Sequence, residues 1–229
     1  MPYRRLPNTD ASRYRALETA LNKSIAVHHT ELAFSQKVLL QVKSFLPTFK
    51  LAMAVYKENS DQLKKLSEQS AQNNKTLRLY FSHFLQVLNL AIIRGEYKEG
   101  IRTYYGLDPK AGNLPDITSD TLLYKWTKKI IEGEELRIRE GGVAMTNPRI
   151  AMVKIKYETL LQSSQSLKVS QHSTRLAQTK IADLRDQADA LILELWNEIE
   201  ATYEALQSDN RRELCTEYGV KYVFRPGER

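Results

Sequence analysis

The chain has 229 residues, of which 42% are hydrophobic and 27% charged, and its formal net charge is +7. This composition is typical of a folded globular protein and argues against intrinsic disorder. The single cysteine, Cys215, excludes an internal disulfide and a cysteine-rich zinc site. No apolar segment follows the first charged residues, and the most apolar stretch, Phe84 to Ile93, is shorter than the ~20 residues of a membrane span. We therefore expect a cytoplasmic protein that does not enter a membrane.

The positive charge is concentrated in the first half of the chain. Residues 1–115 contain 17 Lys and Arg against 9 Asp and Glu, whereas residues 116–229 contain 17 against 18. A basic half can bind nucleic acid or another anionic surface. The basic residues are scattered rather than clustered, so lysine-rich solvated helix faces also explain them, and we favour that explanation.

Glycine and proline are absent from three long segments, residues 8–46, 48–94 and 149–218. Apolar residues recur in these segments at steps of three and four, which is the period of a helix. The sequence thus predicts an all-α fold with long antiparallel helices. A first helix begins near Asp10, with Asn8, Thr9 and Asp10 as candidates for its N-cap.

Residues 30–107 are predicted to form a first helical hairpin. The apolar phase from Phe34 to Tyr56 runs through Pro47, which indicates one kinked helix rather than two. The polar stretch Ser67–Lys75 contains an Asn-Asn pair, which suits a turn between helices. The helix after it is apolar around most of its circumference, so we expect it in the middle of a bundle, with His83 as a hydrogen-bonded core residue.

Residues 108–146 are predicted to form a connector, and residues 147–220 a second hairpin. Ser119 or Asp120 caps a short connector helix, and Asn147-Pro148 is a start signal for the next long helix, with the proline at its first position. The serines and threonine between Ser163 and Thr174 indicate a turn. Residues 221–229 read as an extended tail, which we expect to pair with the chain after Tyr105.

The two hairpins have similar sequences. Each ends in a Tyr-Gly pair, Tyr105-Gly106 in the first and Tyr218-Gly219 in the second. The identity is low and the registers of the helices disagree, so chance similarity stays open beside duplication, which we favour. The expected architecture is a single domain, residues 1–229, in which two related hairpins form a four-helix bundle with an N-terminal helix and a connector helix packed on it.

Five stretches distributed along the whole chain carry a resemblance: MPYRRLPNTD, HFLQVLNLAIIRGE, TNPRIAMVK, LWNEIE and EYGVKYVFR. Through them the chain resembles an uncharacterised family of bacterial all-helical proteins. The resemblance implies an all-helical fold but no activity, cofactor or partner.

We find no motif for catalysis or metal binding. A di-iron site in a helical bundle needs Glu-x-x-His, and no histidine of the chain has a glutamate three residues before it. His28 and His29 lack the spacing of metal ligands. Cys215 has no histidine within forty residues, so a buried structural thiol is the better interpretation. We therefore expect no catalytic residue, no metal and no cofactor.

Two groups of residues are candidates for binding. The aromatic-rich stretch Arg94–Lys110, which leads from the first hairpin into the connector, contains Tyr97, Lys98, Arg102, Tyr104 and Tyr105, and aromatic residues with arginine are favoured at interaction surfaces. We favour the more ordinary explanation that these tyrosines anchor the connector onto the bundle. The candidates for anion contact are Arg4, Arg5 and Arg149, the last near the start of a helix.

The expected function is that of a non-enzymatic helical scaffold or protein-interaction protein, with a protein partner or self-association. The alternative is a nucleic-acid-associated protein that uses the basic first half.

Overall fold

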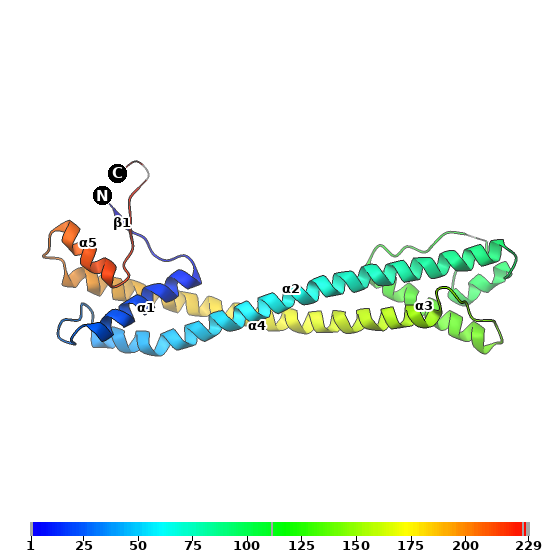
Figure 1. Ribbon diagram of the computed structural model, residues 1–229, viewed down its shortest axis with the longest axis horizontal. Helices are drawn as coiled ribbons and strands as arrows, with labels where there is room; N and C mark the ends of the chain where they lie inside the picture. Colours follow the sequence, from blue (N-terminus) through cyan, green and yellow to red (C-terminus); the bar gives the residue numbers. More distant parts are fainter. Residues whose placement is uncertain (1, 111, 226, 228–229) are drawn as a thin grey trace. The chain divides into compact units, whose positions relative to one another are not determined.

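The fold is all-α, as the sequence predicts. The computed structural model describes residues 2–110, 112–225 and 227. The elements in chain order are β1 (Tyr3–Arg4), α1 (Asp10–Ala26), α2 (Gln36–Ile93), the 3₁₀ helix η1 (Glu99–Tyr105), α3 (Asp120–Arg139), α4 (Ile150–Thr202), α5 (Ser208–Glu217) and β2 (Tyr222–Val223) (Figure 1). The two long helices, α2 and α4, pack against each other.

α2 is one uninterrupted helix of 58 residues that contains Pro47, so the predicted continuation through this proline is confirmed. The turn predicted at Ser67–Lys75 is wrong. This segment contains neither glycine nor proline, and asparagine tolerates a left-handed backbone without requiring it. Asn74 is instead a tertiary partner, because it accepts a hydrogen bond from Arg78 (2.7 Å) and donates one to Asp120 (2.6 Å).

α4 also runs without a break through residues 163–174, so the second predicted turn is wrong as well. Side-chain hydroxyls there bond to helix carbonyls instead of terminating the helix. Ser163 donates to the carbonyl oxygen of Leu160 (3.0 Å), and Thr174 donates to that of Asn59 in α2 (3.2 Å). These serines and threonines therefore contribute to the helix and its packing.

The hairpins predicted for residues 30–107 and 147–220 are each one long helix followed by a short one. α4 begins at Ile150, so Pro148 precedes the helix and does not occupy its first position. Instead of the four helices of the predicted bundle, the long elements are a single antiparallel pair.

The chain forms two compact units. Unit 1 combines Met1–Asp61 with Ser173–Arg229, and unit 2 is Gln62–His172. Each unit contains part of α2 and part of α4. In unit 1 Lys37 pairs with Glu194 (2.9 Å), whereas Asn59 accepts the hydrogen bond from Thr174. Residues with increasing numbers along α2 thus contact residues with decreasing numbers along α4, so the two helices are antiparallel in unit 1.

The core of unit 1 is formed by α1, α2, α4, α5 and the chain after α5. Thr9 caps α1 and forms a capping box with Ser12, which confirms one of the predicted N-caps. The buried side chains of this core come from all of these elements and include Leu17, Ala20, Phe34, Val38, Val42, Ile192, Leu195, Trp196, Ile199, Cys215, Tyr218 and Val220.

Two short strands join the ends of the chain in unit 1. β1 and β2 are antiparallel, with Tyr3 opposite Val223 and Arg4 opposite Tyr222. The prediction that the tail pairs with the chain after Tyr105 is therefore wrong. A lone strand needs the free backbone groups of a neighbour, and the segment before α1 supplies them. Part of the predicted tail (residues 226, 228 and 229) lies outside the described residues.

In unit 2 the second part of α2 packs with η1, α3 and the first part of α4. Ser119 caps α3 by accepting a hydrogen bond from the backbone N–H of Leu122 (3.2 Å), which confirms the predicted start of the connector helix. The buried side chains include Leu77, Phe81, Phe84, Leu85, Leu88, Tyr105, Leu123, Ile130, Val153 and Leu160.

The second part of α2 is not surrounded by other helices, although its sequence predicts this. Leu79, Leu90 and Ile93 are 67%, 51% and 79% exposed, and His83 is exposed as well. The expected core histidine is therefore wrong. The elements packed on this part of α2 cover only part of its circumference, so its remaining apolar side chains face solvent.

Within the described residues α2 is the one helix long and apolar enough to cross a membrane, with a mean hydropathy of 1.4 over its most apolar window. Part of that window, 33%, is buried inside the protein. Length and composition alone do not show a membrane association, because core helices meet the same criteria.

Candidate functional sites

A buried charge cluster lies in unit 2 where η1 meets α3. We call it the Glu134 cluster (Tyr105, Glu134 and Arg137). The side chains of Glu134 and Arg137 are 1% and 4% exposed. Arg137 donates through Nε to Oε2 and through Nη2 to Oε1 of Glu134, both at 2.8 Å. Tyr105 donates to Oε2 at 2.5 Å, and the backbone N–H of Met145 donates to Oε1 at 3.1 Å.

The electrostatics of the Glu134 cluster favour the protonated forms of Tyr105 and Arg137. Burial and the hydrogen bond to Glu134 raise the pKa of Tyr105 well above its usual value. The hydrogen bond to Glu134 raises the pKa of Arg137 as well. Because both carboxylate oxygens already accept hydrogen bonds from the protein, the arrangement is that of a structural ion pair, which holds η1 against α3.

Gly133 allows this close approach. A Cβ atom at this position would lie 2.3 Å from the carbonyl oxygen of Tyr104. Only glycine lets α3 contact the backbone of η1 at this distance, which brings Tyr105 within reach of Glu134.

The connector residues predicted as an interaction surface are largely internal. Tyr105 is fully buried and Arg102 is 5% exposed, so neither is available to a partner. Tyr104 is half-buried and donates to Glu140 (2.5 Å), and the ring of Tyr97 lies 5.2 Å from the guanidinium of Arg137. Lys98 alone among the five is exposed. Tyrosine combines a large apolar ring with a polar hydroxyl, so Tyr97, Tyr104 and Tyr105 pack their rings in the core region of unit 2 while their hydroxyls are hydrogen-bonded.

The three predicted anion contacts lie in different surroundings. Arg4 in β1 donates to Asn197 (2.8 Å) and Glu200 (2.9 Å), so its charge is already paired. Arg5 is exposed and lines a pocket, because successive side chains of an extended segment point to opposite sides. Arg149 is exposed and belongs to unit 2. Arg4 also lines a pocket, but together with its partner Glu200, whereas the pocket beside Arg5 has no carboxylate in its lining.

The pocket beside Arg5 has a volume of about 350 Å³ and lies within unit 1. We call it the Arg5 pocket. Its lining comes from the segment before α1, from α1 itself, from α4 and from the chain after α5: Arg5, Leu6, Pro7, Asn8, Ser12, Arg15, Ala16, Thr19, Trp196, Gly219 and Lys221.

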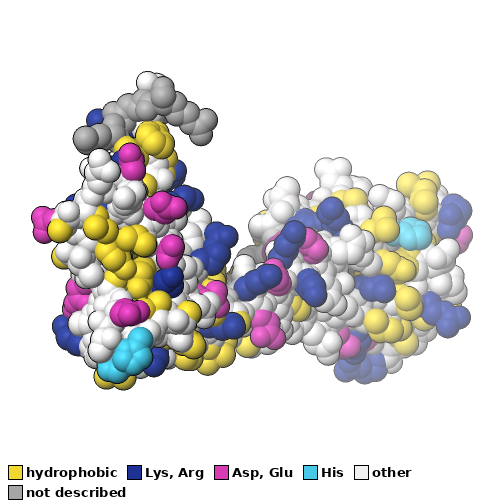
Figure 2. All heavy atoms as spheres, turned by 60° about the vertical axis from the view of Figure 1, so that its left-hand side comes forward, with side chains coloured by type: hydrophobic (Ala, Val, Ile, Leu, Met, Phe, Trp, Pro, Cys, Tyr) yellow, Lys and Arg dark blue, Asp and Glu magenta, His cyan; other side chains and the backbone are white. Residues whose placement is uncertain are grey.

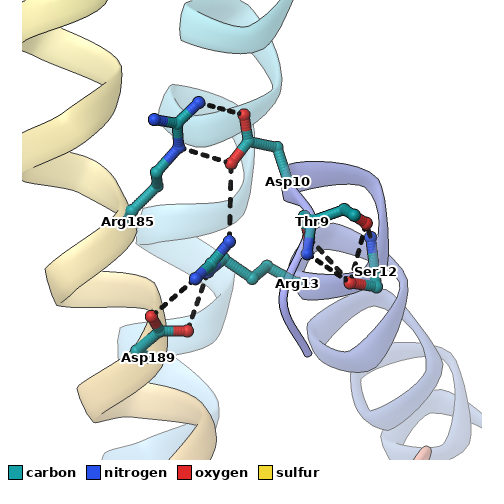
Figure 3. Close-up of polar contacts among 6 residues, drawn as sticks. All are labelled: Thr9, Asp10, Ser12, Arg13, Arg185 and Asp189. Carbon is teal, nitrogen blue, oxygen red and sulfur yellow. Dashed lines mark hydrogen bonds and ion pairs between the residues drawn. The ribbon is translucent and has the colours of Figure 1, made fainter. Parts of the chain in front are cut away.

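A network of ion pairs fastens α1 to α4 in unit 1 (Figure 3). Arg185 donates to both carboxylate oxygens of Asp10 (2.7 and 2.8 Å), and Arg13 donates to both oxygens of Asp189 (2.7 and 2.8 Å). The hydrogen bonds from Arg185 lower the pKa of Asp10. Asp189 of α4 is therefore a partner of α1.

Apolar side chains also remain exposed on the long helices of unit 1. The α2 ridge consists of Leu40, Leu51 and Val55, which are 65%, 63% and 41% exposed. At 3.6 residues per turn these three residues share one side of the helix. Beside them a groove between α2 and α4, the α2/α4 groove, is lined by Gln41, Ser44, Phe45, Gln187, Ala190, Leu191 and Glu194. Figure 2 shows hydrophobic side chains gathered in patches between acidic and basic ones on the part of the protein that is turned forward.

Cys215 is buried, and burial raises the pKa of its thiol, in line with the interpretation as a structural residue. Among the described residues no group of three or more His, Cys, Asp or Glu side chains is placed to hold a metal ion.

Comparisons of the chain with protein-family models, with curated proteins and with solved structures find no match. The resemblance to bacterial all-helical proteins therefore stays a prediction, and function has to be argued from the structure.

Proposed function

We propose that the protein is a non-enzymatic helical scaffold that associates with a second copy of itself through unit 1. The observation that carries the proposal is the α2 ridge beside the α2/α4 groove. Large exposed leucines next to a partly apolar groove are typical of a surface that another helix covers.

The arrangement is self-complementary. A twofold axis parallel to the helix pair keeps every residue at its own level, so it would place Leu40 of each copy over the α2/α4 groove of the other and bring Leu51 and Val55 against the same face further along. Closed, isologous contacts of this kind are the commonest form of self-association. In unit 1 the ion pairs of α1 use Arg185 and Asp189 of α4, whereas Gln187 and Ala190 point to another side of that helix and line the groove.

The charges beside the ridge and the groove agree with this arrangement. Lys43 flanks the ridge on the side away from the groove, and Asp183 and Asp186 flank the groove on α4. All three are exposed, and no ion pair is found for them among the described residues. The antiparallel register places these residues at similar levels along the helix pair. The proposed twofold arrangement therefore brings the lysine of one copy toward the aspartates of the other.

Leu51→Asp tests the proposal, because it places a charge in the centre of the ridge. We expect the wild-type chain to form a dimer in sedimentation equilibrium and Leu51→Asp to raise the dissociation constant by about tenfold or more. The matched control is Leu79→Asp, a similarly exposed leucine of the same helix in unit 2. It should leave the dimer intact, and circular dichroism should show unchanged helix content in both variants.

A charge exchange provides the second test. Lys43→Glu should weaken the dimer, and combining it with Asp183→Lys and Asp186→Lys should restore it, because the attraction is re-formed with opposite signs. A wild-type chain that stays monomeric at about 100 µM would overturn the proposal. So would equal weakening by Leu51→Asp and Leu79→Asp.

Nucleic-acid binding by the basic first half has less support. Of its 17 basic residues nine lie in unit 1 and eight in unit 2. In the described part of the chain, six of them pair with carboxylates: Arg4, Arg13, Lys23, Lys37, Arg78 and Arg94. We expect no binding of duplex DNA at about 150 mM salt. Binding whose log–log salt slope is about −0.9 per neutralised phosphate would favour the alternative.

A further inference from the structure

We infer that the Arg5 pocket binds a small phosphorylated compound through its phosphate group. This inference does not depend on self-association, since the Arg5 pocket and the α2/α4 groove have no lining residue in common.

The fold brings two cations together at the mouth of the Arg5 pocket. The backbone N–H of Arg5 donates to the carbonyl oxygen of Lys221 at 2.8 Å, in continuation of the pairing between β1 and β2. Residues bonded across two antiparallel segments lie close together. Gly219 has a φ of 92°, and a Cβ there would lie 3.0 Å from the carbonyl oxygen of Ala16. This glycine lets the last segment pass close to α1, where Arg15 adds a third cation.

Among the described residues these three cations differ from neighbouring ones because no carboxylate pairs with them. Arg4 pairs with Glu200 and Arg13 pairs with Asp189. No ion pair joins Arg5, Arg15 or Lys221 to a carboxylate within the described residues, and the pocket lining contains neither Asp nor Glu. Like charges that converge without a counter-charge repel one another, and a bound anion would remove that repulsion.

A buried hydrogen-bond donor also belongs to the pocket wall. Trp196 is 1% exposed, and its indole Nε1–H has no hydrogen-bond partner in the described part of the chain. An indole N–H can only donate, and a buried donor without an acceptor is costly. The hydroxyls of the lining are already used: Ser12 donates to the carbonyl oxygen of Thr9 and Thr19 to that of Arg15.

The donors and the volume define the class of ligand. Guanidinium and ammonium groups offer donors and positive charge, and a phosphate offers several acceptor oxygens and negative charge. Arginine recognises the planar or tetrahedral oxygens of such anions in a forked geometry. A volume of about 350 Å³ exceeds the need of phosphate alone. Leu6, Pro7 and Ala16 provide apolar contacts for a small organic part of the compound.

The binding test uses the fluorescence of Trp196. The chain has two tryptophans, so Trp126→Phe in unit 2 leaves Trp196 as the only emitter. In this background we titrate inorganic phosphate and glycerol 3-phosphate against sodium chloride at constant ionic strength, with calorimetry as an independent readout. We expect a saturable change in emission, with glycerol 3-phosphate binding at least as tightly as inorganic phosphate.

Removal of a single cation tests where the anion binds. Arg5→Gln and Lys221→Gln should each weaken phosphate binding by about tenfold or more, which is the worth of one charge-assisted hydrogen bond. Lys64→Gln removes the same charge from an exposed position in unit 2 and should leave the affinity unchanged. Circular dichroism checks that each variant keeps its helices.

Three results would overturn the inference. The first is no saturable change in emission or heat up to about 10 mM phosphate. The second is an equal loss in Lys64→Gln and Arg5→Gln, which would indicate nonspecific screening. The third is binding of a thymidine oligonucleotide that is much tighter than binding of inorganic phosphate and whose log–log salt slope corresponds to several neutralised phosphates. This result would indicate a nucleic-acid surface rather than a pocket for a small compound.

Discussion

In unit 1 and in unit 2 an ion pair joins a short capped helix to a long one, but the two units differ in whether their other charged groups are buried or exposed. α1 is capped by Thr9 and its first residue, Asp10, pairs with Arg185 of α4. α3 is capped by Ser119 and its first residue, Asp120, pairs with Arg78 of α2. The helix entry and its ion pair are therefore the same kind of structure in both units.

The Tyr-Gly pairs extend this correspondence. Tyr105 and Tyr218 are both buried in the cores of their units, and the glycines that follow them, Gly106 and Gly219, both have positive φ. Duplication stays a prediction. These correspondences favour a repeat that begins at α1 and at α3, earlier than the two hairpins predicted from the sequence.

The two units differ in their buried polar groups and in what lies beside the paired ends of the chain. Unit 2 buries an ion pair, Glu134 with Arg137, against Tyr105. Unit 1 keeps Arg5 and Lys221 at an open pocket beside the paired chain ends. One helical plan thus supports a closed polar interior in one unit and an open basic pocket in the other. Three comparisons between pairs of variants probe the two units, in order of decreasing effect.

Glu134→Gln should have the largest effect. It leaves the buried guanidinium of Arg137 without a counter-charge, and breaking a buried pair in this way costs about 3–5 kcal/mol of the free energy of unfolding. Urea unfolding followed by circular dichroism measures the loss, and hydrogen exchange should locate it in unit 2. The neighbouring Glu135 is half-exposed and pairs with Lys154 at the surface, so Glu135→Gln should cost about 0–1 kcal/mol. Equal losses in the two variants would contradict a structural role for the Glu134 cluster.

Gly133→Ala should have an intermediate effect. The added methyl group meets the backbone of Tyr104, so α3 and η1 have to move apart, and overpacking of this kind costs about 1–3 kcal/mol. Gly100→Ala is the control, because a Cβ at Gly100 meets nothing within 4 Å. Thermal unfolding compares the two variants, and a fully stable Gly133→Ala would show that the contact is not as tight as the geometry indicates.

Asp10→Asn and Asp120→Asn compare the two helix entries and should have the smallest effects. The side chain of Asp10 is 21% exposed and that of Asp120 is 63% exposed. The more exposed pair is screened by solvent, so we expect a loss of about 1 kcal/mol for Asp10→Asn and less for Asp120→Asn. Urea unfolding at neutral pH measures both, and a larger loss for Asp120→Asn would contradict the comparison.

The effect of Asp10→Asn on the free energy of unfolding should depend on pH. The hydrogen bonds from Arg185 lower the pKa of Asp10 in the folded state. A carboxylate with a lowered folded-state pKa stabilises the fold above its unfolded-state pKa of about 3.9, and that stability is lost as the pH falls through the folded-state pKa. The difference in unfolding free energy between the wild type and Asp10→Asn should therefore have its largest value at neutral pH and decrease below about pH 4. A difference that grows on acidification would show that another group dominates.

Local backbone chemistry made part of this fold predictable. The glycine- and proline-free segments and their apolar period indicate the helices, and Thr9 and Ser119 are N-caps because their hydroxyls accept from the first turn. The continuation through Pro47 follows from an apolar phase that is not reset there. Each of these features depends on residues a few positions apart, which a sequence displays directly.

Only the tertiary structure decided the rest. The polar stretches 67–75 and 163–174 suit a turn or an exposed helix equally well, and contacts such as Asn74 with Asp120 and Thr174 with Asn59 favoured the helix. Glutamate and arginine are usually exposed, so the burial of Glu134 could not be expected without knowing that Arg137, Tyr105 and the backbone of Met145 surround it. The Arg5 pocket exists because the two ends of the chain pair with each other, and the partner of a two-residue strand depends on long-range packing rather than on its own sequence.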